Sequence, residues 1–263
     1  HPYKDENIGK MEHLDAATLE EFMAYHKTYY GPNNAVLIVA GDIETEETIE
    51  LVKKYFDEVP RGNEVVRNFP KEEPISENVR AIAYDRNIQI PMLLSSFRTP
   101  GFASRDSYVL DMISTYLSSG KSSVLYKKLV DNQKQALQTQ VINLGQVDYN
   151  IFAILALPLG DVSLDTLLTE IEEEIEKVQN ELISERDHQK LLNKFESQFV
   201  NSNSSIAGIA NSLARYYLLY GDVNLINKEI DIYRSISREE IRSVAQKYLS
   251  PNQRVDIEYL PGE

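Results

Sequence analysis

The apolar positions of the chain repeat with two different periods, and together they predict a protein of mixed helices and strands. Phe22, Tyr25 and Tyr29 lie three or four residues apart, as on one helical face, while runs such as 254–259 are rich in strand-forming residues and come shortly after a Pro-Asn pair. Helices are predicted over 16–30, 44–56, 104–117, 122–132, 164–183, 186–200, 206–220 and 237–249. Strands are predicted over 35–40, 79–84, 88–97, 136–147, 150–157 and 254–259.

Two segments of the chain have the same pattern. Residues 18–42 align without a gap with residues 237–261, at an offset of 219 residues. Each segment begins at a hydroxyl residue, Thr18 or Ser237, with a Glu three residues later, which is a capping box. An apolar helical stripe, a Pro-Asn stop and a β-rich run follow in the same register. The identical pairs are Glu20/Glu239, Glu21/Glu240, Tyr29/Tyr248, Pro32/Pro251, Asn33/Asn252, Val36/Val255 and Ile38/Ile257.

This self-similarity predicts an internally duplicated α+β protein in which the first copy is incomplete. We expect residues 1–62 to be the C-terminal part of the first repeat and residues 63–78, which are polar and rich in Pro, to be a linker. Residues 79–263 are then the second repeat. Strand runs toward both ends of this repeat, with helical runs between them, predict a mainly antiparallel sheet with helices on one face.

The charge and the amino-acid composition of the chain disfavour several kinds of binding partner and of chemical site. The 263 residues carry 27 Lys plus Arg against 41 Asp plus Glu, a net charge of −14, which disfavours nucleic acid and anionic lipid. Cysteine is absent, which excludes disulfides, thiolate–zinc sites and a Cys nucleophile. No apolar run approaches the roughly 20 residues that a membrane span needs.

The histidines give no metal motif. His1, His13, His26 and His188 form neither H-x-x-E-H nor H-E-x-x-H. His26 lies on an apolar helical stripe, and we expect it to be half-buried in a core. Glu185 and His188 have the E-x-x-H spacing of carboxylate-bridged metal sites, but such sites need two copies, so a solvated helix face is the better interpretation.

Gly120-Lys121-Ser122 invites a phosphate-loop interpretation. A Walker A motif needs a Gly where Thr115 stands and a preceding strand where a helix is predicted. We therefore expect Gly120 to end one helix, with Ser119 or Ser122 capping the next.

Three segments of the chain resemble peptidase family M16, the insulinase, pitrilysin and processing-peptidase group. The first is HPYKDENIGKMEHLDAATLEEFMAYHKTYYGPNNAVLIVAGDI, which is similar to the second half of the family's catalytic domain. The others are YLSSGKSSVLYKKLVDNQKQA and the closing LARYYLLYGD with SREEIRSVAQKYLSPNQ. The resemblance covers essentially the whole chain, its first segment is the most specific, and the two-copy architecture of the family matches the repeat.

The resemblance implies a zinc-dependent endopeptidase that cleaves unfolded peptides. Its zinc ligands and its catalytic Glu belong to an H-x-x-E-H motif and a downstream Glu, which would precede His1. No catalytic residue and no metal ligand is therefore predicted within this chain. Many second domains of the family bind substrate through an Arg and a Tyr seven residues apart, and these positions fall on Val130 and Leu137. Because a Val cannot donate to a peptide carbonyl, this aid to substrate binding is expected to be lost.

Two functional hypotheses remain open. In the first, the chain is the C-terminal portion of an M16-type zinc peptidase and forms one wall of its peptide-binding cleft, with a strand edge for an extended peptide. In the second, the parent is a non-catalytic subunit that binds peptides or scaffolds a catalytic mate. The expected partners are a peptide and either the N-terminal part of the same protein or a catalytic M16 subunit, with dimer formation left open. For the compartment, we expect the periplasm or cytoplasm of a bacterium.

Overall fold

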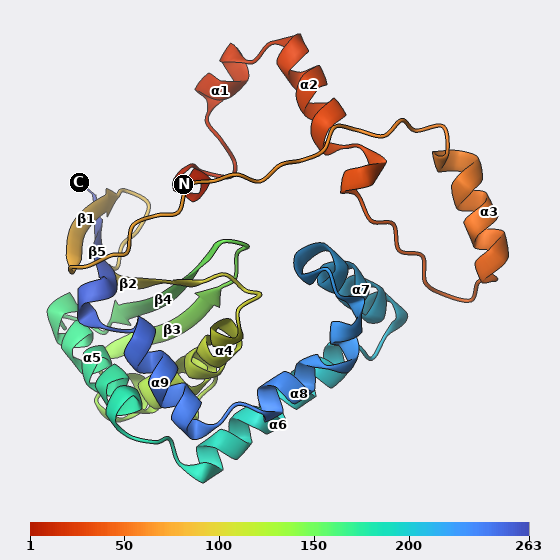
Figure 1. Cartoon of the computed structure of the whole chain (residues 1–263). Helices are drawn as coiled ribbons and strands as arrows, with labels where there is room; N and C mark the ends of the chain where they lie inside the picture. Colours follow the sequence, from red (N-terminus) through yellow and green to blue (C-terminus); the bar gives the residue numbers. More distant parts are fainter. Residues whose placement is uncertain (263) are drawn as a thin grey trace. The chain divides into compact units, whose positions relative to one another are not determined.

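The computed structural model describes residues 1–262, which form two compact units (Figure 1). The first unit consists of residues 1–73 and 202–223, and the second consists of residues 74–201 and 224 onward. The boundaries predicted for the two repeats and the linker stay a prediction. No helix within residues 1–262 combines the length and apolar character needed to cross a membrane.

The second unit is built on a sheet that, in the described part of the chain, has five strands in the order β1-β5-β2-β4-β3. Only the β1–β5 pair is parallel, and the β5–β2, β2–β4 and β4–β3 pairs are antiparallel. The predicted mainly antiparallel sheet is therefore confirmed. The strands are β1 (Val79–Asp85), β2 (Met92–Pro100), β3 (Ala136–Leu144), β4 (Tyr149–Pro158) and β5 (Arg254–Pro261).

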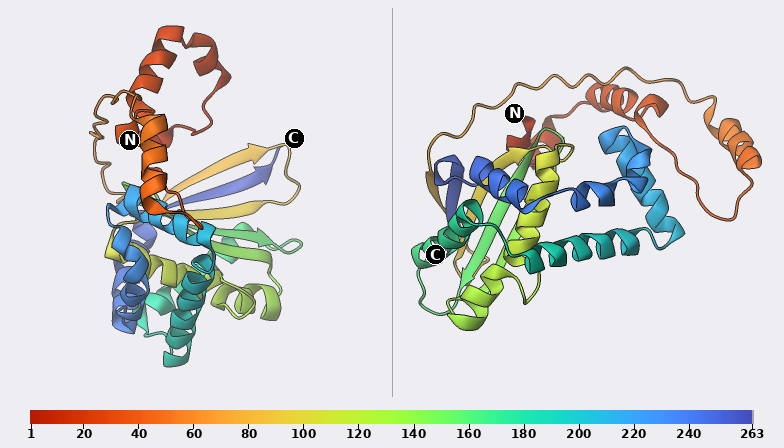
Figure 2. Two further views of the ribbon diagram at one scale, coloured as in Figure 1. Left: turned by 90° about the vertical axis from the view of Figure 1, so that its right-hand side faces the viewer. Right: turned by 60° about the horizontal axis from the view of Figure 1, so that its bottom comes forward.

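Helices cover one face of this sheet, as predicted (Figures 1 and 2). Burial alternates along β2, where Leu93 and Phe97 point into the helix layer and their neighbours do not. Phe97 meets Phe152 of β4 edge to face, with ring centroids 6.3 Å apart, and both side chains are fully buried. The covering helices are α4 (Arg105–Ser118), α5 (Leu164–Asn180) and α9 (Arg238–Tyr248).

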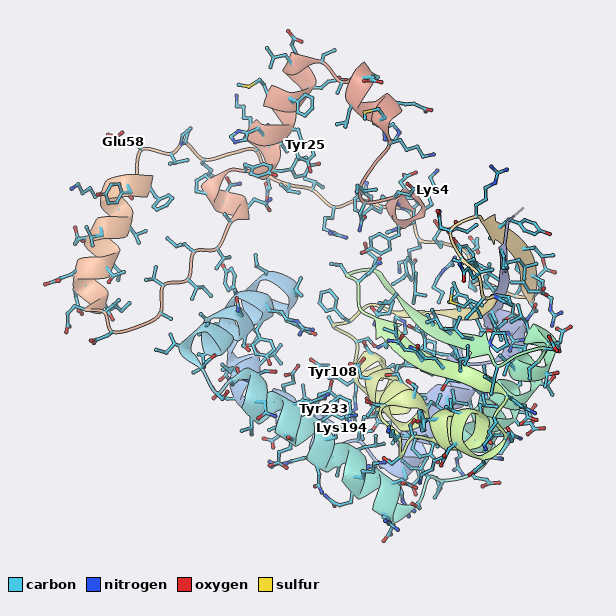
Figure 3. All side chains as sticks on the ribbon, turned by 180° about the vertical axis from the view of Figure 1, so that it is seen from behind. Lys4, Tyr25, Glu58, Tyr108, Lys194 and Tyr233 are labelled. Carbon is cyan, nitrogen blue, oxygen red and sulfur yellow. The ribbon has the colours of Figure 1, made fainter. Side chains whose placement is uncertain are left out.

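The remaining helices of the second unit are held to α4 by aromatic contacts. Tyr233 of α8 (Glu229–Arg234) stacks on Phe195 of α6 (Glu185–Ser202), with ring centroids 4.2 Å apart. Its other side meets Tyr108 of α4 edge to face at 5.3 Å (Figure 3). The Tyr233 hydroxyl donates to Asp111 at 3.3 Å. Burial and the nearby carboxylates raise the pKa of Tyr233, so this hydroxyl stays a donor.

The first unit consists of helical segments with little burial. Its elements are η1 (Pro2–Lys4), α1 (Met11–Ala16), α2 (Leu19–Tyr29), η2 (Pro32–Asn34), α3 (Thr45–Phe56) and α7 (Ile206–Tyr220). The apolar faces of α2 and α3 are exposed: Phe22 is 55% exposed and Tyr55 is 68% exposed. These faces have the amphipathic pattern of core helices, but no described residue buries them.

Two expectations for this unit were wrong. Residues 35–40 do not form a strand, because in the described structure no other segment pairs with them. His26 is exposed rather than half-buried in a core, and its ring stacks on Tyr30 with centroids 5.2 Å apart.

The two similar segments have nearly the same local backbone. In both, a hydroxyl side chain caps the helix: Thr18 accepts from the Glu21 amide at 3.3 Å, and Ser237 accepts from the Glu240 amide at 3.1 Å. Each helix then leads through a short 3₁₀ turn, η2 or η5 (Pro251–Gln253), into extended backbone. Glu21 completes its capping box, whereas Glu240 turns outward to accept from Arg105 at 2.6 Å. The duplication itself stays a prediction.

Candidate peptide-binding face

The sheet face opposite the helices carries an apolar patch, which we name the open face, beside the polar residues Ser96, Arg98, Gln138 and Gln140. In one row across the sheet, Leu94 of β2 lies between Leu155 of β4 and Ile257 of β5. These side chains are half-buried, and no helix of the second unit covers them in the described residues. The open face is formed by Met92, Leu94, Ile142, Ile151, Leu155, Leu157, Val255 and Ile257.

Strands β1 and β3 are the edges of this sheet. An edge strand presents backbone N–H and C=O groups that can pair with an added extended chain. Val79 of β1 is 43% exposed and lies in the same row as Val255. An apolar face bounded by two pairing edges can therefore take an extended peptide with apolar side chains.

The positions of the family's Arg and Tyr lie in the helical turn before strand β3 and at the start of that strand. Val130 is half-buried in the π-helical turn η3 (Tyr126–Asn132). Leu137 is 46% exposed and lies at a bulge, since Ala136 pairs with Pro158 while Gln138 pairs with Leu157. Neither side chain offers a hydrogen bond, so the assignment of a substrate-binding position to either residue stays a prediction.

Lys128, two residues before Val130, is engaged elsewhere. Its amino group contacts Glu170 at 2.8 Å, Glu173 at 2.7 Å and Glu174 at 3.1 Å, all on α5. Burial alone would lower the pKa of Lys128, but hydrogen bonds to these carboxylates outweigh it and raise the pKa. A cation held by three carboxylates is not free to replace the missing Arg.

The described residues do not fit a zinc site. Among residues 1–262, no group of three or more His, Cys, Asp or Glu side chains is placed to hold a metal ion. The ring of His188 bonds through Nε2 to the Ile236 carbonyl at 2.8 Å, while Glu185 is exposed and contacts Arg238 at 3.4 Å. The E-x-x-H spacing therefore reflects a helix face, part of which packs against the segment before α9.

The Gly120-Lys121-Ser122 loop follows a helix, not a strand. Gly120 has φ of +81°, in the left-handed region, directly after α4 ends. The predicted capping of the next helix by Ser119 or Ser122 was wrong. Both hydroxyls instead accept hydrogen bonds from lysines of α6, Ser122 from Lys190 at 2.6 Å and Ser119 from Lys194.

A buried ionic cluster lies between the sheet and the helices, and it was not predicted from the sequence. Arg254 and Asp256 of β5 point into the helix layer, and their side chains are 4% and 3% exposed. The Ser95 hydroxyl donates to Asp256 at 2.6 Å, and Asn78 donates to the same carboxylate at 2.8 Å. The alternation of charged and apolar residues in β5 was the available signal, but it is more typical of a solvated face.

The second unit is thus an α+β domain with a mainly antiparallel sheet and no grouped metal ligands among its described residues. The family model described as "Peptidase M16 inactive domain" matches residues 16–195. The chain therefore belongs to peptidase family M16.

Individual relatives agree with this assignment. The chain is 27% identical over 259 residues to the zinc protease PqqE of Helicobacter pylori, covering 98% of this chain and 58% of that protein. It is 24% identical to a probable mitochondrial-processing peptidase subunit beta of Arabidopsis thaliana, covering 92% and 47%. The crystal structure of a protease from Helicobacter pylori superposes with a TM-score of 0.89 at 25% identity, covering 98% and 63%. The chain thus spans about half the length of the curated relatives it matches.

Proposed function

We propose that this chain is the non-catalytic C-terminal portion of an M16 zinc endopeptidase and forms one wall of the cleft that binds unfolded peptides. The observation that carries the proposal is the open face, an apolar sheet surface with a pairing strand at each edge. An extended peptide can add its backbone to an edge strand while its alternate side chains rest on the apolar surface. The zinc proteases among the relatives support peptide hydrolysis as the reaction of the whole protein.

The first unit supports cooperation with further polypeptide. Its α3 and the preceding segment form an apolar groove of about 360 Å³, lined by Leu37, Val39, Ile43, Ile49 and Val52 among others. Exposed apolar patches of this kind mark surfaces that pack against another partner. We infer that the catalytic portion of the same protein, which would also hold the zinc, covers these residues.

A second candidate is a subunit that binds peptides for a separate catalytic M16 mate. Val130 and Leu137 favour it, because they stand where many family members have an Arg and a Tyr for substrate. The coding region before His1 distinguishes the two. An intact H-x-x-E-H roughly 100 residues upstream supports the peptidase, and a degenerate motif supports the subunit.

Peptide binding is tested by fluorescence anisotropy with a labelled, unstructured peptide. We expect Leu94→Glu and Leu155→Glu to weaken binding about tenfold or more, because each buries a carboxylate under the peptide. The matched control is Leu182→Glu, which makes the same change at an exposed residue just after α5. Equal affinity for all three variants would contradict the open face as the binding surface.

Zinc is tested on the same material. Elemental analysis of the purified chain should find zinc well below one equivalent, and incubation with the peptide should give no cleavage. Stoichiometric zinc would show that the metal ligands lie within this chain and would overturn the assignment of the zinc to another portion.

A further inference from the structure

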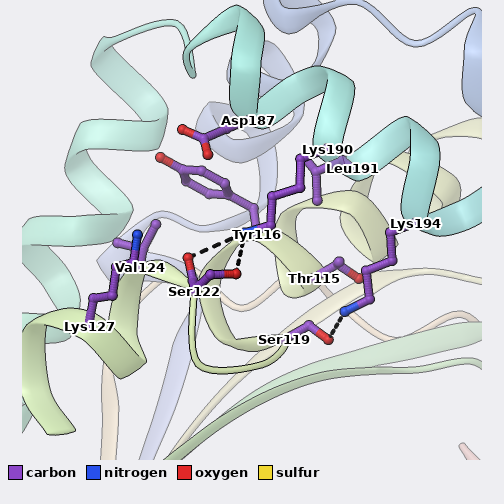
Figure 4. Close-up of a pocket in the computed structure, with 10 residues that line it drawn as sticks. All are labelled: Thr115, Tyr116, Ser119, Ser122, Val124, Lys127, Asp187, Lys190, Leu191 and Lys194. Carbon is purple, nitrogen blue, oxygen red and sulfur yellow. Dashed lines mark hydrogen bonds between the residues drawn. The ribbon is translucent and has the colours of Figure 1, made fainter. Parts of the chain in front are cut away.

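A small pocket lies between the end of α4 and helix α6, entirely within the second unit (Figure 4). It has a volume of about 100 Å³, and hydroxyl groups and lysines dominate its polar lining. The polar residues that line it include Thr115, Ser119, Ser122, Lys127, Lys190 and Lys194. The pocket lies in the helix layer, so it is separate from the open face.

Lys190 and Lys194 are four residues apart on one face of α6, and both turn toward the loop that follows α4 (Figure 4). The Lys190 amino group donates to the Ser122 hydroxyl at 2.6 Å and to the Ser122 carbonyl at 3.3 Å. The Lys194 amino group donates to the Ser119 hydroxyl. The two cations are therefore held at the pocket by neutral oxygens.

No carboxylate of the described residues forms an ion pair with these lysines or with Lys127. Other lysines of the second unit are paired, for example Lys128 with carboxylates of α5 and Lys247 with Asp106 at 2.7 Å. The chain has 41 acidic residues and 27 basic ones, so carboxylates are in excess as partners for lysines. A cluster of lysines without carboxylate partners is therefore unusual in this chain. Burial and the neighbouring Lys190 lower the pKa of Lys194, which means that its charged form is disfavoured at this position. A bound anion would stabilise the charged form.

One acidic residue also lines the pocket. Asp187 is held at the start of α6, where its carboxylate accepts from the Ser184 hydroxyl at 2.7 Å. Three lysines against this single carboxylate leave the pocket positive. Lysine amino groups and hydroxyls are the donors that phosphate oxygens accept from.

We propose that this pocket binds a phosphate group, either inorganic phosphate or the phosphate of a small phosphomonoester. Pockets for drug-sized ligands measure roughly 300–1,000 Å³, so a site of this volume holds the phosphate and leaves any larger substituent outside. The lysines would turn from the serine oxygens to the phosphate, and the hydroxyls of Ser119 and Ser122 would donate to it.

The proposal is tested by calorimetric titration of the purified chain with inorganic phosphate at constant ionic strength, against chloride. We expect saturable binding with one site per chain. Lys190→Gln and Lys194→Gln should each weaken it about tenfold or more, the loss of one charge-assisted hydrogen bond. Lys121→Gln is the matched control, because Lys121 lies in the same loop but does not line the pocket. Circular dichroism in chloride verifies that each variant is folded.

Two further titrations identify the source of the phosphate. Tighter binding of O-phosphoserine than of inorganic phosphate would assign the site to phosphomonoesters, and the reverse order would assign it to the free ion. Binding that appears only with vesicles of anionic phospholipid would overturn the proposal of a small ligand. Absence of saturable phosphate binding, or an equal loss in Lys121→Gln, would overturn the site and leave the lysines as hydrogen-bond donors that fix the loop after α4.

Discussion

Arg254 of β5 and Glu172 of α5 are joined by a hydrogen bond of 2.5 Å that ties the sheet to its helix layer. The same guanidinium donates through Nε to Asp256 at 2.9 Å, so one cation holds two carboxylates. Asp256 also accepts from Ser95 of β2, the neighbouring strand. This cluster lies where three elements meet, and it is the most deeply buried charge of the described fold for which an ion pair is seen.

We expect Arg254→Met to destabilise the second unit by roughly 3–5 kcal/mol, because it leaves the Asp256 carboxylate buried without its cation. Urea unfolding followed by circular dichroism measures the change. The double variant Arg254→Met with Asp256→Asn should recover part of the loss, since it removes the uncompensated charge. A double variant less stable than the single one would contradict this account.

Gly101 follows β2 at a place where backbone approaches backbone. A Cβ atom there would lie 2.1 Å from the Val147 carbonyl oxygen, and the neighbouring Phe102 amide donates to the Gln146 carbonyl at 3.0 Å. Gly101→Ala should therefore cost about 1–3 kcal/mol of unfolding free energy. Gly145→Ala is the control in the facing segment, where the new methyl meets only the Phe102 Cβ at 3.4 Å. Equal thermal unfolding midpoints for both variants would refute the predicted clash.

Asp106 at the start of α4 gives a pH-dependent link to α9. Burial alone would raise its pKa, but hydrogen bonds from Lys247 and Tyr248, both 2.7 Å long, hold the pKa below its ordinary value. The stability from this carboxylate is therefore present at neutral pH and is lost as the pH falls through its folded-state pKa, below about 3.9.

Asp106→Asn should accordingly cost about 1.5 kcal/mol at pH 7, and the difference from the parent chain should shrink in acid. Unfolding by urea across a pH series measures this. Asp165→Asn serves as the control because it is also in the first turn of a helix and its contact to Arg80 is exposed, so it should cost under about 0.5 kcal/mol. A loss for Asp106→Asn that does not change with pH would rule out the charge as its cause.

The peptide-binding role of the family's Arg and Tyr positions can be tested by restoring them. The double variant Val130→Arg with Leu137→Tyr should bind the labelled peptide roughly tenfold more tightly, through donors that the present side chains lack. Val130→Leu with Leu137→Phe enlarges both side chains without adding a donor. If this apolar pair tightens binding as much, the gain comes from contact area and not from hydrogen bonds.

The two units should respond differently to loss of an aromatic ring. Phe152→Ala empties a fully buried site of the second unit and should cost about 3–5 kcal/mol. Phe22→Ala removes an exposed ring of the first unit and should change stability by less than about 0.5 kcal/mol in this chain. Thermal unfolding compares them. A large cost for Phe22→Ala would mean that its ring is buried in solution.

Local signals were enough to place most of the helices. The helix predicted over 206–220 coincides with α7, and a Ser cap with a following apolar stripe placed α4 to within a residue. The prediction of a strand over 35–40 was wrong because a strand forms only when a second strand pairs with it, and a local sequence pattern does not show whether that second strand is present. The M16 family was recognised from its motifs, and the family model supports it.

The lysine pocket and the Arg254 cluster could not be found in this way. The pocket brings the loop at 119–122 against residues 187–194 of a helix that is more than sixty positions later in the chain. The burial of Arg254 and Asp256 depends on which face of β5 the helices cover, and a charged residue in a strand predicts the opposite. Both are results of tertiary packing.

The order of the strands in the sheet also determines when each strand can pair as the chain is synthesised. β5, the last described strand along the chain, lies inside the sheet between β1 and β2. During synthesis β1 leaves the ribosome more than 160 residues before β5, the one strand that pairs with it among the described residues, so β1 stays unpaired while β2 and the β3–β4 hairpin can already associate. A nascent chain interrupted before residue 254 would leave β1 unpaired and expose the edge of β2 that β5 later covers, and unpaired strand edges favour association with other chains.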